Sequence, residues 1–325
     1  MRHQQLSRMM HGRPAATLMV LAAALAMLVA HVLGDEVAAP EAARAAPAFA
    51  GQLTGTAAII INVVLMLGLM TLMVLLNRRH NILRAVTYLD VGLVALMQAA
   101  VPVALDGLNG GLLVAPVILL CMHRMFEAYA DGHDMRGVFL SFLLLSAGAS
   151  VEYAFVLFIP ALWLMLAQMR IFTVRAVLAS VMGIVTPWIL LFGFGIVSPD
   201  DMVLPHIRSI FSVSQWLERP VLITAAAGFT AMLLIGSVML NVLKTIAYNA
   251  RARAFNGALN LISAFAILAM VVDFGNLGAY LPLLNVCAAY QLTHYFVNYR
   301  YERQYLAVLA IAAIYILSFL WQIIL

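Results

Sequence analysis

The sequence predicts an all-α protein, a polytopic transmembrane helix bundle with about eleven membrane segments. Of its 325 residues, 65% are hydrophobic and 10% are charged, whereas a water-soluble domain has about 25% charged residues. Apolar runs of roughly the 17 to 25 residues that cross a bilayer recur along the whole chain. No stretch between them is long enough to fold separately, so residues 1–325 are expected to form a single integral membrane domain.

The expected membrane segments follow the apolar runs, with boundaries good to a few residues. Two of them, 111–123 and 137–150, are short. The full set is 16–33, 56–76, 87–105, 111–123, 137–150, 152–169, 174–197, 220–243, 256–272, 278–297 and 304–325.

The first segment, 16–33, follows a basic N-terminus, 1–15, that we expect to be cytoplasmic. This arrangement also resembles a signal peptide. Because the apolar run is long, we expect a retained helix; cleavage within 34–39 is the alternative. Either outcome places the Ala/Pro-rich loop 34–55 outside, as a strap or a helix lying on the membrane.

The next three segments are separated by clear punctuation. The motif NRRHN (77–81) follows the second segment, and the turn GLNGG (107–111) precedes the fourth. Asp90 lies inside the third segment and is a functional candidate, because ionisable groups inside membranes are costly. The alternative is a snorkelling arrangement with Arg84 at the membrane interface.

Segments 137–150 and 152–169 predict a pair of short helices that meet at an external turn. Fourteen helical residues rise about 21 Å, which is less than a bilayer core of about 30 Å. Glu152 stands between the two segments. Its carboxylate either lines an external cavity, as a substrate-binding group, or stabilises the N-terminus of the second helix through the helix dipole.

The remaining segments, from 174 onward, are ordinary apolar runs. Between the last two lies the sequence YQLTHYFVNYRYERQY, which is typical of an aromatic belt at the lipid headgroups. Anionic lipid is a further candidate partner at Arg300 and Arg303.

Basic residues set the expected orientation. If the N-terminus is cytoplasmic, only Arg44, Arg208 and Arg219 of the 18 Lys and Arg residues fall outside. The positive-inside rule therefore predicts a multi-pass protein of the bacterial inner membrane, with the N-terminus cytoplasmic and the C-terminus periplasmic. The same rule explains the net charge of +4, and no nucleic-acid partner is needed.

We expect no metal site or disulfide of the usual kinds. Cys121 and Cys287 both lie inside apolar runs without a CxxC pairing. The set His123, His133 and Asp134 fits neither the HxxxH nor the HExxH spacing.

Three stretches resemble an uncharacterised family of bacterial multi-pass inner-membrane proteins of about 300 residues. They are 75–129, which contains NRRHN; 139–191, with the short helical pair; and 281–317, beginning LPLLNVCAAYQLTHYF. The resemblance implies a helix bundle in the inner membrane and no known activity.

A weaker resemblance is to the C-type glycosyltransferase superfamily. Its counterparts here are the acidic pair Asp35 and Glu36, Asp106 in a later external loop, the helical pair in 137–160, and the basic turn and Pro-ended helix in 170–187. The resemblance implies a polyprenyl-phosphate-sugar donor and makes Asp35, Glu36 and Asp106 the candidate catalytic residues. Such acids act as a base toward an acceptor hydroxyl or as ligands of a divalent cation. At Glu152 the chain departs from the superfamily, which often has a basic residue there.

We therefore expect an inner-membrane protein of glycosyltransferase-like fold that handles a polyprenyl-linked glycan at the periplasmic face. The alternative is a non-catalytic subunit or scaffold that binds other proteins of an envelope assembly or secretion machine. A transporter is the third hypothesis.

Overall fold

The computed structural model describes residues 12–33, 56–101, 110–131, 135–197, 207–211, 221–299 and 304–324. Within these residues every regular element is helical, so the all-α class is confirmed. The elements are α2 (Arg13–Leu33), α3 (Thr56–His80), α4 (Leu89–Ala99), α5 (Gly111–Glu127), α6 (Met135–Ala149), η2 (Tyr153–Phe158), α7 (Ile159–Gln168), α8 (Val174–Gly193), α10 (Val221–Thr245), α11 (Ala250–Val272), η4 (Phe274–Asn276), α12 (Leu277–Asn298) and α13 (Gln304–Ile324).

Several of these helices have the length and composition of membrane spans. Five qualify: Ile60–His80, Val174–Gly193, Ile223–Thr245, Ala250–Val272 and Gln304–Trp321. The other helices are shorter or less apolar. For example, α4 has 11 residues and rises about 16 Å, against a bilayer core of about 30 Å. The helices thus indicate a membrane protein, and their lengths establish fewer than the eleven expected spans.

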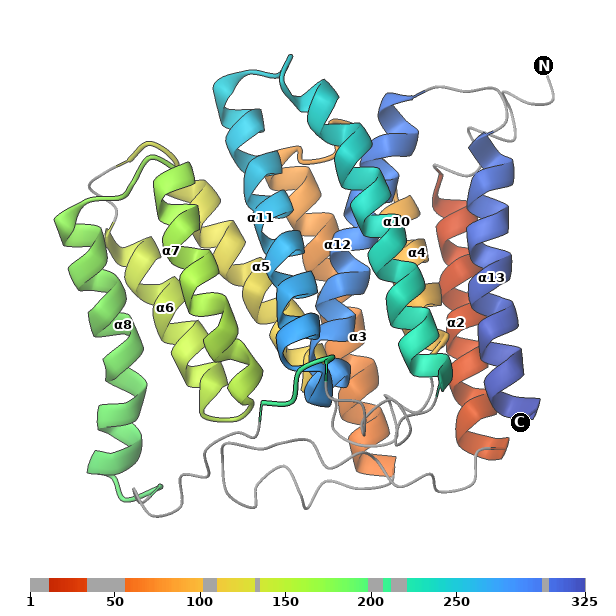
Figure 1. The fold of residues 1–325 in the computed structure, drawn as a ribbon, viewed down its shortest axis with the longest axis horizontal. Coiled ribbons are helices and arrows are strands. Elements are labelled where there is room, and N and C mark those ends of the chain that lie inside the picture. The colour runs from red at the N-terminus through yellow and green to blue at the C-terminus, as the bar shows by residue number, and fades with distance from the viewer. Residues whose placement is uncertain are drawn as a thin grey trace.

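Successive helices run in opposite directions (Figure 1), so the turns between them lie at two ends of the bundle. These two ends differ in their charged residues. Arg13 at the start of α2 lies over the Tyr88 ring just before α4. Lys244, near the end of α10, donates to the Asn298 carbonyl at the end of α12 at 2.9 Å. We call this end the basic end, since every described Lys and Arg except Arg208 lies there or in the adjoining turns.

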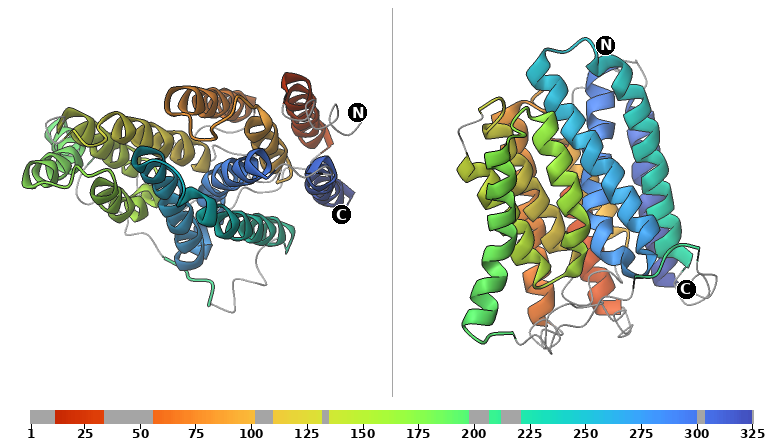
Figure 2. Two further views of the ribbon diagram at one scale, coloured as in Figure 1. Left: turned by 90° about the horizontal axis from the view of Figure 1, so that it is seen from above. Right: turned by 60° about the vertical axis from the view of Figure 1, so that its left-hand side comes forward.

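Helix α12 is the centre of the bundle (Figure 2), and most of its residues are buried. Two of its buried polar side chains, Tyr290 and Gln291, hydrogen-bond to neighbouring helices. The Tyr290 hydroxyl donates to the Met73 carbonyl on α3 at 2.9 Å. The Gln291 side chain accepts from Asn241 on α10 at 2.8 Å and donates to Asn260 on α11 at 2.6 Å. These bonds offset the cost of burying polar groups and fix the helices around α12.

The chain reverses between α6 and α7 at the position expected from the two short apolar runs. The amides of Val151 and Glu152 both donate to the Gly148 carbonyl at 2.9 Å. Gly148 is required here, because a Cβ at this position would lie 2.7 Å from the ring of Phe155. The tight turn places Glu152 at the end of the bundle opposite to the basic end (Figure 1).

Candidate functional site

Two carboxyl groups that are far apart in the sequence meet at this opposite end, which we call the carboxylate end. Glu152 lies in the turn after α6, and Asp273 lies between α11 and η4. Their residues are 3% and 0% exposed, respectively. We call the carboxylate cluster the set of Glu152, Tyr153, Asp273, Asn276 and Tyr280.

Asp273 is oriented by two tyrosines. The hydroxyls of Tyr153 and Tyr280 both donate to its Oδ2 atom, the latter at 2.8 Å. Its Oδ1 atom is buried and has no hydrogen-bond partner among the described residues. The group is therefore held in one orientation with one acceptor oxygen unused, which is unusual for a buried carboxyl.

Glu152 is hydrogen-bonded on several sides. Its Oε1 atom accepts from Asn276 Nδ2 at 2.9 Å and from the Ala154 amide, at the start of η2, at 3.4 Å. Its Oε2 atom lies at the start of α5, where a Cβ on Gly110 would be 2.5 Å away. The carboxyl thus caps η2 and also faces the N-terminus of α5, where the helix dipole favours a negative charge.

A short segment, 207–211, runs beside Asp273. The Gly275 amide donates to the Arg208 carbonyl at 3.1 Å, and the Ile210 amide donates to the Val271 carbonyl at 3.0 Å. A Cβ on Gly275 would lie 3.2 Å from Arg208 Cβ and 3.5 Å from Asp273 Oδ1. Among the described Lys and Arg residues, Arg208 is thus the one at the carboxylate end, and its exposed side chain starts close to the unused oxygen of Asp273.

This arrangement can do two things chemically. A fixed carboxyl with an unused oxygen can accept a proton from a hydroxyl group or contribute one ligand to a cation. A neighbouring guanidinium can bind a phosphate through paired N–H donors.

The expected catalytic residues Asp35, Glu36 and Asp106 lie outside the described residues. Asp35 and Glu36 directly follow α2, and Asp106 precedes Gly110 by four residues. Glu152 is described: it is buried, and it accepts a hydrogen bond from Asn276. In the described part of the chain, no group of three His, Cys, Asp or Glu residues is placed to hold a metal ion.

Sequence reasoning missed the role of Asp273 and its two tyrosines. Asp273 is not among the candidate residues predicted from the sequence. It lies in the break between α11 and η4, where helical spacing does not predict which side chains meet.

Asp90 does not form the interfacial pair with Arg84 that was one of the two interpretations of the sequence. Its side chain is buried, with 1% of the residue exposed, and within the described part of the chain no hydrogen-bond partner is found for either carboxyl oxygen. The Arg84 guanidinium lies instead over the Tyr248 ring, 4.2 Å from its centroid. The pairing of Asp90 with Arg84 was therefore wrong.

The chain matches no protein-family model, no curated protein and no solved structure. The function is therefore argued from the residues and their geometry.

Proposed function

We propose that this chain spans a bacterial inner membrane many times, with the basic end in the cytoplasm and the carboxylate end in the periplasm. The segregation of described Lys and Arg residues to one end of the bundle supports this orientation through the positive-inside rule. The alternating helix directions also support it, because α2 and α13 both begin at the basic end and end at the carboxylate end. In this proposal the shorter helices complete the set of eleven passes.

Reporter fusions test this topology. A fusion at Gly132 is expected to report cytoplasm, and a fusion at Val203 is expected to report periplasm. A reversed pair of signals would exclude a periplasmic carboxylate end.

At that end we propose a glycosyltransferase-like activity on a polyprenyl-linked glycan. The observation that carries it is the unused Oδ1 atom of Asp273, held by two tyrosines and adjacent to Arg208. In this proposal Asp273 takes the proton of an acceptor hydroxyl, and Arg208 binds the phosphate of the lipid carrier. Asp35, Glu36 and Asp106 supply acceptor contacts or ligands of a divalent cation.

This proposal requires that a substrate hydroxyl can reach Asp273. Asp273 is fully buried, and two backbone hydrogen bonds join segment 207–211 to the end of α11 and to η4. A substrate hydroxyl reaches Oδ1 only when these contacts open. Opening costs these two hydrogen bonds, of about 1 kcal/mol net each, and also the packing of Ile210 against the hydrophobic core.

Binding of the lipid carrier tests the role of Arg208. The Arg208→Gln variant is expected to bind polyprenyl phosphate about tenfold more weakly, which corresponds to about 1.4 kcal/mol. Arg175→Gln, which removes the same charge at the basic end, serves as the matched control. Equal affinity in both variants would exclude Arg208 as the phosphate ligand.

A non-catalytic scaffold is the second candidate, and a specific observation favours it. The described hydrogen bonds of the carboxylate cluster join the α6–η2 turn to the α11–α12 connection, which is what a structural tie would do. A scaffold needs the hydrogen bonds of Asp273 but not its basicity. Alanine substitutions at Asp35, Glu36 and Asp106, each with protein level measured, separate the two functions. Normal envelope glycans in all three variants, together with a glycan defect in the deletion strain, would exclude catalysis through these three acids and favour the scaffold.

A further inference from the structure

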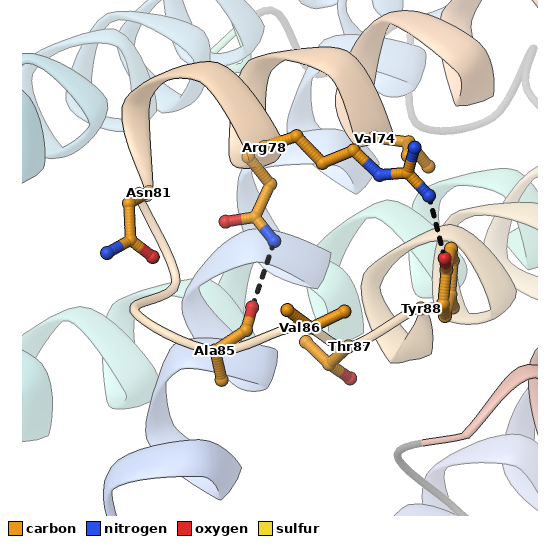
Figure 3. A pocket seen from close by; sticks show the side chains of 8 residues that line it. Val74, Arg78, Asn81, Ala85, Val86, Thr87 and Tyr88 are labelled. Carbon is orange, nitrogen blue, oxygen red and sulfur yellow. Dashed lines mark hydrogen bonds between the residues drawn. The ribbon is translucent and has the colours of Figure 1, made fainter.

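A small cavity lined by polar and apolar residues (Figure 3) lies at the basic end, at the other end of the bundle from the carboxylate cluster (Figure 1). It has a volume of about 160 Å³ and lies between the end of α3 and the loop that leads to α4. Its lining residues are Val74, Asn77, Arg78, Asn81, Ala85, Val86, Thr87 and Tyr88.

The wall of this cavity is built by the side chain of Asn77. Its Oδ1 atom accepts from the Leu83 amide at 2.9 Å, and its Nδ2 atom donates to the Ala85 carbonyl at 3.2 Å. Asn81 and Arg84 have φ angles of 51° and 55°, a left-handed conformation that is costly for residues other than glycine. The loop is therefore held in a specific shape around the cavity instead of following the shortest path between the helices.

Two arginines converge on one side of the cavity. Arg78 donates to the Tyr88 hydroxyl at 2.8 Å, and the Arg13 guanidinium lies 5.6 Å from the centre of the same ring. Hydrogen bonds from both guanidinium groups, that of Arg13 first, lower the pKa of Tyr88. Arg78 belongs to the cavity lining, and Arg13 lies beside the lining residue Tyr88. No carboxylate is among the described lining residues. A cavity with this charge distribution is suited to a negatively charged ligand.

The surroundings of the cavity are apolar. Val86 is 85% exposed, and Leu75, beside the lining residue Val74, is 55% exposed. An exposed apolar rim next to a cationic cavity has the chemistry of the membrane interface, where acyl chains meet phosphate groups. A soluble anion would gain nothing from Val86 and Leu75.

We propose that this cavity binds the phosphodiester headgroup of an anionic phospholipid, with Arg13 and Arg78 contacting the phosphate and Val86 contacting the acyl chains. Asn81 and Thr87 offer further hydrogen-bonding groups within the lining. The site is independent of the proposed activity at the carboxylate end.

The full chain in nanodiscs tests this proposal. Nanodiscs of phosphatidylcholine with a small fraction of phosphatidylglycerol are used, and the phosphatidylglycerol retained after detergent extraction is counted by native mass spectrometry. The Arg13→Gln/Arg78→Gln variant is expected to retain it about tenfold more weakly, as expected for about 1.4 kcal/mol of lost charge-assisted hydrogen bonding. Arg175→Gln, an exposed cation of the same end on α8, is the matched control and is expected to behave as the wild type.

Two results would overturn the proposal. Equal retention by the wild type, the double variant and the control would show that no specific headgroup site exists. Competition by millimolar inorganic phosphate as strong as that by phosphatidylglycerol would assign the cavity to a free phosphate. If the double variant does not fold, Arg78→Gln alone is measured against the same criterion.

Discussion

The hydroxyl of Tyr280 donates a 2.8 Å hydrogen bond to Oδ2 of Asp273, across the connection between α11 and α12. Together with the bond from Tyr153, it holds a fully buried carboxyl group in one orientation. The same two bonds tie the α6–η2 turn to the most buried helix of the bundle. This link connects the stability of the carboxylate end to the chemistry proposed for it.

Removing the Tyr280 hydroxyl is therefore expected to destabilise the protein. Tyr280→Phe should cost about 1.5 to 3 kcal/mol, because a hydrogen bond to a charged group is lost and the buried acceptor is less satisfied. Tyr290→Phe is the matched control on the same helix: its hydroxyl donates to the neutral carbonyl of Met73, so it should cost about 0.5 to 1.5 kcal/mol. Unfolding in mixed micelles measures both, and an equal or reversed order would contradict the assignment.

Close packing of α6 against α8 depends on Gly183. A Cβ at this position would lie 2.6 Å from the Phe139 carbonyl oxygen, which belongs to the backbone and cannot move aside. Gly183→Ala is expected to destabilise the protein by about 1 to 3 kcal/mol, as overpacking does.

Gly236→Ala on α10 is the control for this substitution, because nothing lies within 4 Å of its added Cβ. It should be neutral or stabilise by up to about 1 kcal/mol, since alanine favours a helix over glycine. A neutral Gly183→Ala variant in the same unfolding assay would show that the two helices are farther apart.

The buried Asp90 side chain is expected to lower the stability of the folded protein. Its carboxyl oxygens are buried without partners, so Asp90→Ala should raise the free energy of unfolding by about 1 kcal/mol, because an unsatisfied buried polar group is removed. A clear loss of stability would show instead that Asp90 binds a partner in the membrane. That outcome would favour the transporter hypothesis, since intramembrane acids are typical of ion pathways.

The sequence predicted the helices better than their contacts. The apolar run 278–297 corresponds closely to α12 (Leu277–Asn298), because hydrophobicity marks such a helix directly. The start of α11 was placed at 256 but lies at Ala250, since the basic side chains of Arg251 and Arg253 were taken for a loop. Their exposed positions on the first turns, after the cap by Asn249, allow a helix there.

Contacts between distant segments could not be predicted in the same way. Glu152 was correctly placed at a turn, because the run before it, 137–150, is too short for the bilayer. Its bond to Asn276 depends on how α6, α7 and α12 pack, and periodicity in one sequence carries no information on that packing. Asp273 was missed for the same reason, because its tyrosine partners come from two elements far apart in the chain.

The most direct test of the account is the Asp273→Asn variant in a strain that lacks this protein. The asparagine oxygen can still accept from both tyrosines, so protein level and unfolding midpoint should change little, while the group can no longer take a proton. We expect the variant to show the same envelope-glycan defect as the deletion, whereas the wild-type chain restores the glycans. Normal glycans with Asp273→Asn, or in the deletion itself, would contradict catalysis by the carboxylate cluster.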